Sequence, residues 1–121
     1  MKTADQPQAA PTRTSVDIDL LNRIDLRVRA IASSLGAREM QYPALISRPV
    51  LERAGYPRAF PHLLMSASRH DGGTAQDWCL SPAVCYHAFA HLAGRVMEDS
   101  TALTARGRCF RAEQETAPGI R

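Results

Sequence analysis

The stretch Gly36-Ala-Arg-Glu-Met-Gln-Tyr-Pro-Ala-Leu-Ile46 decides how the first half of the chain divides into elements. Glycine readily adopts the left-handed conformation in which many helices end, so Gly36 predicts the end of a preceding helix. Residues 38–46 predict a strand, which Pro43 interrupts because proline has no N–H to donate to a neighbouring strand. We therefore expect Pro43 at a sheet edge, a bulge or an interface.

The segment before Gly36 has the apolar periodicity of one long helix. Apolar residues recur at spacings of three and four and form a single stripe, which consists of Leu21, Ile24, Val28, Ile31 and Leu35. Thr14 or Ser15 suits the N-cap, and acidic residues suit the first turn. Residues 1–14 are polar and contain two prolines, so they predict a disordered tail, with one domain over residues 15–121.

The segments after the proline predict shorter elements. A short helix is expected over residues 49–54, closed by Gly55, and then an ordered loop over residues 55–64. A turn at residues 69–76 precedes a strand at residues 77–80, which together indicate a hairpin. Pro82 suits the first position of a helix that runs to about Leu92, and residues 106–113 predict the last strand.

Arg111 and Glu113 are the chemically most informative pair. Side chains alternate along a strand, so residues two apart share a face. A guanidinium can fork onto a phosphate, and a carboxylate can accept a hydrogen bond from an amine. This pair therefore suits a nucleotide, although on spacing alone an exposed ion pair that contributes little stability is the favoured interpretation.

The remaining reactive side chains give weaker signals. A free cysteine such as Cys85 is most often a small buried hydrophobe, and neither Cys79 nor His87 adds a strong zinc spacing to it. His87 and His91 are four residues apart and share a helix face, without the context of a metalloprotease motif. Four aromatic residues have a spacing that suits a helix–sheet core: Trp78, Tyr86, Phe89 and Phe110.

The composition is typical of one soluble domain: 121 residues, 45% of them hydrophobic. The sequence contains no run long enough to span a membrane and no secretory signal at its N-terminus. The three cysteines are odd in number and lack framework spacing, so they predict reduced thiols or metal ligands rather than disulfides, and a cytoplasmic location. The net charge of +3 is dispersed, which favours a solvated basic surface over a nucleic-acid footprint.

Four stretches occur in an order that resembles one family. They are residues 36–46, Leu51-Glu-Arg-Ala-Gly-Tyr-Pro-Arg-Ala-Phe-Pro61, Leu80-Ser-Pro-Ala-Val-Cys-Tyr-His87 and Gly107-Arg-Cys-Phe-Arg-Ala-Glu113. Together they resemble the catalytic domain of class II aminoacyl-tRNA synthetases of the seryl type, and more closely the amino acid:[carrier protein] ligases. The resemblance implies an α+β fold, with an antiparallel sheet of about three strands and flanking helices.

The resemblance also implies roles for individual residues. Arg111 resembles the second-motif arginine that holds the ATP α-phosphate and the amino acid carboxylate, and Glu113 resembles the carboxylate on the adenine side. Cys85 resembles the first of three ligands to a zinc ion that binds the substrate amino group. ATP with Mg²⁺ and Zn²⁺ are the implied cofactors, and an acyl or peptidyl carrier protein is the implied partner. The first-motif helix and strand imply a homodimer, and the short tail before that helix disfavours tRNA.

The sequence departs from the family after residue 121. The second strand of the second motif, two further zinc ligands and the third motif with its ATP-binding arginine have no counterpart. The resemblance thus implies a domain truncated within the second motif and inactive alone. The alternatives are a non-catalytic dimerisation or regulatory module that pairs with an intact paralogue, an aminoacyl-tRNA synthetase-like fragment, and an incomplete gene product.

Overall fold

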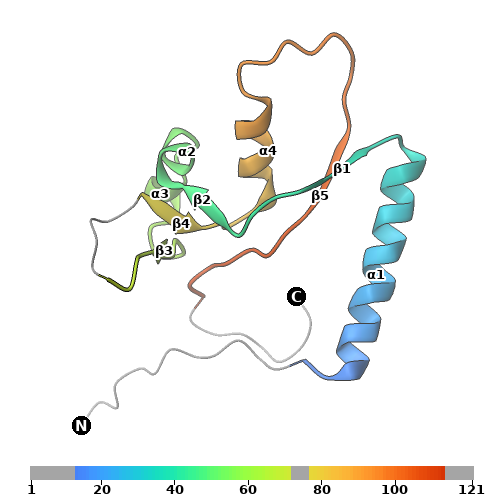
Figure 1. The fold of residues 1–121 in the computed structure, drawn as a ribbon, viewed down its shortest axis with the longest axis horizontal. Coiled ribbons are helices and arrows are strands. Elements are labelled where there is room, and N and C mark those ends of the chain that lie inside the picture. Colours follow the sequence, from blue (N-terminus) through green and yellow to red (C-terminus); the bar gives the residue numbers. More distant parts are fainter. Residues whose placement is uncertain (1–12, 72–76, 114–121) are drawn as a thin grey trace.

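The computed structural model describes residues 13–71 and 77–113. Its elements in chain order are α1 (Ser15–Ser34), β1 (Arg38–Gln41), β2 (Leu45–Ser47), α2 (Arg48–Arg53), α3 (Tyr56–Ala59), β3 (Ser66–Ala67), β4 (Trp78–Leu80), α4 (Val84–Leu92) and β5 (Leu103–Arg106) (Figure 1). Most of the predicted N-terminal tail, residues 72–76 of the predicted turn, and residues 114–121 lie outside the described residues.

Both ends of α1 are fixed by local hydrogen bonds, as the sequence predicts. Thr14 is the N-cap, and it forms a reciprocal capping box with Asp17. At the other end Gly36 has φ +69°, its N–H donates to the carbonyl of Ser33, and the N–H of Ala37 donates to the carbonyl of Ala32. This pair of bonds is a Schellman motif, so the helix stops because its last carbonyls are satisfied by the turn that follows.

The proline break at residue 43 divides the predicted strand between two sheets, which confirms the expected interruption. β1, before the break, pairs in parallel with β5, from Arg38 opposite Leu103 to Gln41 opposite Arg106. β2, after the break, joins an antiparallel sheet of order β2-β4-β3. The antiparallel sheet with flanking helices agrees with the expected α+β architecture, whereas the separate parallel pair was not foreseen.

The core lies where the antiparallel sheet meets α2 and α3. Ile46 of β2 stands opposite Cys79 of the central strand β4, and Leu51 of α2 is fully buried beside them. Tyr56 of α3 completes this buried cluster, against which three partly buried residues pack: Val50, Leu64 and Tyr86. The helical turn α3 therefore contributes to the core, although the sequence predicted only a loop there.

The four aromatic residues that the sequence assigned to the core differ in burial. Tyr86 packs against the cluster and Phe110 is half-buried. Trp78 is 41% exposed and Phe89 is 72% exposed, so the prediction is wrong for these two. Phe89 is exposed because its face of α4 has no element of the described chain packed over it.

The predicted strand over residues 106–113 is also wrong. The strand β5 lies earlier, and residues 107–113 belong to no strand. β5 pairs in parallel with β1 and gives main-chain hydrogen-bond partners to that edge of Arg38–Gln41. Residues 107–113 instead run over the surface of the antiparallel part of the molecule.

The helix α1 lies at the edge of the molecule and buries none of its residues (Figure 1). An exposed cluster of ion pairs joins it to the parallel strands: Arg106 lies 2.9 Å from Asp25 and 3.4 Å from Glu39, and Arg29 lies 2.9 Å from Glu39. The hydrogen bond from Arg29 holds the pKa of Glu39 below its usual value.

Among the described residues, no helix has the length and apolar character that a membrane span requires.

Candidate functional site at the start of helix α4

The segment of residues 107–113 docks on the molecule through main-chain hydrogen bonds. The N–H of Phe110 donates to the carbonyl of Ser81 over 2.9 Å, and the N–H of Ala112 donates to the carbonyl of Leu63 over 3.0 Å. The two acceptors belong to different loops, so no strand ladder forms. The docking nevertheless holds the segment beside the start of α4.

Gly107 makes this close approach possible. A Cβ atom at residue 107 would lie 2.8 Å from Cγ1 of Val84, the first residue of α4. Gly107 does not have the left-handed backbone conformation, so what requires glycine here is lack of space and not a special φ. The glycine that opens the sequence motif therefore brings the segment against the helix.

Arg111 is fixed at the same helix end. Its Nε donates to the carbonyl of Pro82 over 3.2 Å, and its charge opposes the rise that burial causes in the pKa of Tyr86. The residue is exposed, and its four terminal N–H groups make no hydrogen bond within the part of the chain that the structure describes. The guanidinium is thus oriented by one bond and keeps the fork that can bind an anion.

Glu113 is the last described residue, and it does not share a strand face with Arg111. Its N–H donates to the carbonyl of Arg111 over 2.9 Å, which makes a tight turn. The alternation that the sequence analysis used therefore does not apply, because the backbone is not extended at this point. A nucleotide role for Arg111 and Glu113 stays a prediction that the geometry does not test.

Cys85 lies exposed in the first turn of α4, close to where Arg111 binds Pro82. Within residues 13–71 and 77–113, no three His, Cys, Asp or Glu side chains form a group that could hold a metal ion. A zinc role for Cys85 stays a prediction, which the described residues alone do not test. The alternative interpretation of Cys85, a small buried hydrophobe, is wrong because Cys85 is exposed. The buried cysteine is Cys79, and its burial raises the pKa of the thiol.

His87 has a structural role that the sequence did not indicate. Its ring stacks on Tyr42 with the centroids 5.4 Å apart and an angle of 7°, and His91 contacts the same ring at 6.3 Å. Burial lowers the pKa of His87, although a hydrogen bond with the backbone of Pro43 acts in the opposite direction. The two histidines share a helix face, as predicted. On that face they pack against Tyr42, beside the point at which Pro43 interrupts the strand.

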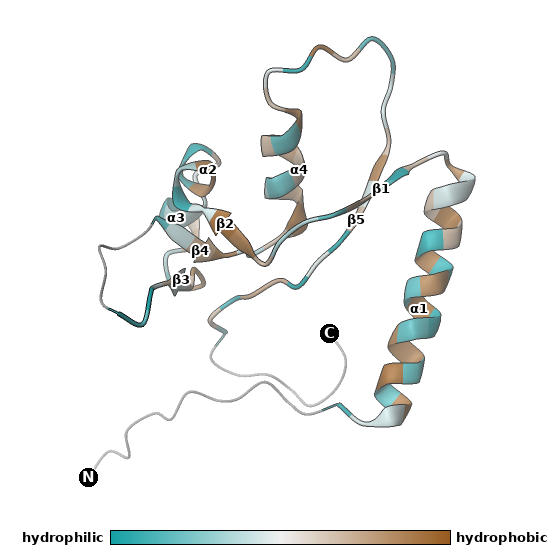
Figure 2. Ribbon diagram, viewed as in Figure 1, coloured by the Kyte–Doolittle hydropathy of each residue, from teal (hydrophilic) through white to brown (hydrophobic). Residues whose placement is uncertain are grey.

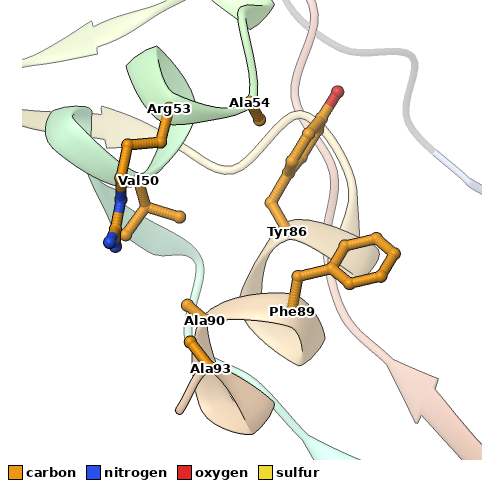
Figure 3. A pocket seen from close by; sticks show the side chains of 7 residues that line it. All are labelled: Val50, Arg53, Ala54, Tyr86, Phe89, Ala90 and Ala93. Carbon is orange, nitrogen blue, oxygen red and sulfur yellow. The ribbon is translucent and has the colours of Figure 1, made fainter.

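A groove lies between α2 and α4. It has a volume of about 460 Å³, and side chains of the two helices face each other across it (Figure 3). Its lining consists of Val50, Arg53, Ala54, Tyr86, Phe89, Ala90 and Ala93. None of the sequence-predicted site residues, Cys85, Arg111 and Glu113, is among them.

Comparison with known proteins gives two similarities. No protein-family profile matches the chain. The chain is similar to the amino acid–[acyl-carrier-protein] ligase 1 of Bradyrhizobium diazoefficiens, with 29% identity over an alignment of 101 positions that covers 64% of this chain and 31% of the ligase. The chain therefore spans about a third of the length of this curated relative.

The fold is similar to the crystal structure of the RNA binding domain of a threonyl-tRNA synthetase from Cryptosporidium parvum Iowa II. The TM-score is 0.63, the identity is 18%, and the match covers 78% of this chain and 23% of that one. At this identity the likeness shows the fold alone. The mixed fold with a small antiparallel sheet is thus similar to that of an aminoacyl-tRNA synthetase domain.

Proposed function

We propose that the chain corresponds to the first part of the catalytic domain of an ATP-dependent amino acid:[carrier protein] ligase. The distant similarity to such a ligase supports this, together with the order of the four sequence stretches. The single observation that favours it most is the position of Arg111, which is oriented by Pro82 and has the rest of its guanidinium available for an anion. An arginine held in this way suits a phosphate better than a flexible surface side chain does.

The proposed reaction has two steps. The carboxylate of a small amino acid attacks the α-phosphate of ATP, and pyrophosphate leaves with the electron pair of the broken P–O bond. The phosphopantetheine thiol of a carrier protein then attacks the acyl carbon, loses its proton, and displaces AMP. Arg111 would stabilise the charge that develops on the α-phosphate, and Glu113 would accept a hydrogen bond from the adenine amine. No step is assigned to zinc, because Cys85 lacks companion ligands among the described residues.

We expect the 121-residue chain alone to show no ATP–pyrophosphate exchange with glycine or alanine. The reason is that the chain spans only about a third of the length of the ligase to which it is similar. A chimera supplies the sharper measurement: the chain replaces the matching third of the Bradyrhizobium ligase, and exchange is measured with and without Arg111→Ala. Arg111→Ala removes a positive charge that would be held beside the negative charge developing on the α-phosphate. The exchange rate is therefore expected to fall about 100-fold.

Arg108→Ala in the same chimera is the matched control. Arg108 is exposed on the same segment and has no ion pair among the described residues, so its removal should leave exchange within about twofold. Equal losses in the two variants would contradict the role of Arg111. Clear exchange by the isolated chain would contradict its inactivity alone.

A second candidate function, association through α1, has its own observation. Figure 2 shows hydrophobic residues interspersed with hydrophilic ones along this helix, and several of the hydrophobic side chains are exposed. The predicted stripe includes Ile24, Val28, Ile31 and Leu35, each about half exposed or more. Its members recur seven residues apart, from Ile24 to Ile31 and from Val28 to Leu35, which is the spacing of a seam between two helices.

If α1 pairs with another copy, light scattering after size exclusion should give twice the monomer mass of 13.3 kDa. The double substitution Ile24→Ser with Ile31→Ser should restore the monomer, because it removes two apolar contacts from the seam. Leu26 is 61% exposed and lies on the opposite side of the helix, so Leu26→Ser should keep the dimer. A monomer for the unsubstituted chain at tens of micromolar would count against this function.

A further inference from the structure

The groove between α2 and α4 is separate from the proposed nucleotide residues and has no occupant among the described elements. The rings of Tyr86 and Phe89 stand on the α4 side, and Val50 and Arg53 stand on the α2 side (Figure 3). Apart from the guanidinium of Arg53 and the hydroxyl of Tyr86, the lining side chains are apolar. The lining thus presents an apolar surface that no described element covers.

The groove is too open for a small molecule. Pockets for small ligands bury most of the ligand surface. Here Phe89 is 72% exposed, and the three alanines of the lining are exposed as well. The groove therefore suits one face of a macromolecular segment, which covers these side chains from outside, better than it suits a ligand enclosed on all sides.

On each of the two helices, the residues that line the groove are three or four positions apart in the sequence. On α2 the lining residues are Val50, Arg53 and Ala54, and on α4 they are Tyr86, Phe89, Ala90 and Ala93. Residues three and four apart share one helix face, so each helix turns a single face to the groove. Such a groove accommodates the apolar face of a third helix, and the alanines let its backbone approach closely.

The α2 end of the groove is positively charged. Arg53 lines the groove and makes no ion pair or hydrogen bond within residues 13–71 and 77–113. A terminal nitrogen of Arg58 would lie 3.5 Å from a Cβ atom at Gly55, which follows the lining residue Ala54, and Arg58 also has no partner among the described residues. A partner that places carboxylates at this end would pair two cations that have no partner among the described residues.

We propose that the groove between α2 and α4 binds an acidic amphipathic helix of another protein. An apolar side chain of that helix enters between Val50 and Phe89, and a carboxylate of the helix pairs with Arg53. This inference does not depend on the proposed ligase chemistry, because Cys85, Arg111 and Glu113 are not part of the groove.

The test uses two synthetic helical peptides of roughly 15 residues with the same leucine face. One peptide carries glutamates beside that face and the other carries lysines at the same positions. Fluorescence anisotropy of the labelled peptides with the full chain should give at least about tenfold tighter binding of the glutamate peptide, and the difference should shrink at high salt. Equal binding of the two peptides would overturn the proposal.

Two substitutions of groove residues test whether the peptides bind in the groove: one reverses a charge, and the other removes an aromatic ring. Arg53→Glu should reverse the preference between the peptides, and Phe89→Ser should weaken binding of the glutamate peptide by about tenfold. Both side chains are exposed, so circular dichroism should show an unchanged thermal midpoint. Matched controls are Val96→Ser, which removes a 92% exposed apolar side chain outside the lining, and Arg23→Glu on α1.

Two outcomes would contradict the assignment. If Arg53→Glu and Arg23→Glu change peptide binding equally, the interaction depends on net charge and not on the groove. If the unliganded chain is a dimer that Phe89→Ser dissociates, the groove is occupied by a second copy of this chain and not by an acidic helix.

Discussion

Replacing Leu51 by alanine is expected to destabilise the chain by about 3 kcal/mol. Leu51 is fully buried, and among the described residues its cluster has three other buried hydrophobic members, so few neighbours can move into the cavity. A domain of this size has only about 5–15 kcal/mol of stability in total, so the loss takes a large share of it. Urea denaturation followed by far-ultraviolet circular dichroism measures the change.

Leu26→Ala is the control for the same chemical change at the surface. Leu26 is exposed on α1, so its truncation should cost less than about 0.5 kcal/mol. A loss below about 1 kcal/mol for Leu51→Ala would contradict the placement of the core between the antiparallel sheet and α2.

Gly107→Ala is expected to cost about 1–3 kcal/mol and to release the segment that carries Arg111. The new Cβ would lie 2.8 Å from Cγ1 of Val84, and a β-branched side chain on a helix has few other rotamers to adopt. The segment must then move away from α4 and lose the hydrogen bond from Arg111 to Pro82. Hydrogen exchange should show faster exchange of the Phe110 amide, which otherwise donates to Ser81.

Val84→Ala provides the rescue that identifies the cause. It removes the methyl group that the new Cβ would meet, so the double variant should lose less stability than the sum of the two single variants. Strict additivity would show that Gly107 acts in some way other than through its contact with Val84.

The sequence predicted correctly those features that depend on nearby residues. The predicted N-cap at Thr14 and the predicted turn at Gly36 are closed by hydrogen bonds between residues at most five apart. Pro43 interrupts a strand because of its own covalent structure, and Gly55 ends α2 with φ +75°. Each of these outcomes follows from the conformational preferences of one residue and its neighbours.

The strand predicted over residues 106–113 shows why the candidate site was only partly foreseen. The sequence analysis recognised Cys85 and Arg111, which both lie at the start of α4. The position of the segment that carries Arg111 depends on Ser81 and Leu63, which precede it in the sequence by about 30 and 50 residues. Those carbonyls accept the N–H groups of Phe110 and Ala112 and hold the segment without a ladder. No pattern within seven residues can show which distant carbonyls will be near.

The sequence by itself thus determined the long first helix with its two ends, the break at Pro43 and a synthetase-like order of segments, because backbone propensities and caps act over a few residues. Only the tertiary structure decided which sheet each strand joined, that Cys79 is buried while Cys85 is exposed, and that Phe89 lines an open groove. Burial is a property of what packs against a residue. For residues 36–46, the sequence marked the break at Pro43, and pairing with β4 and β5 decided where each half went.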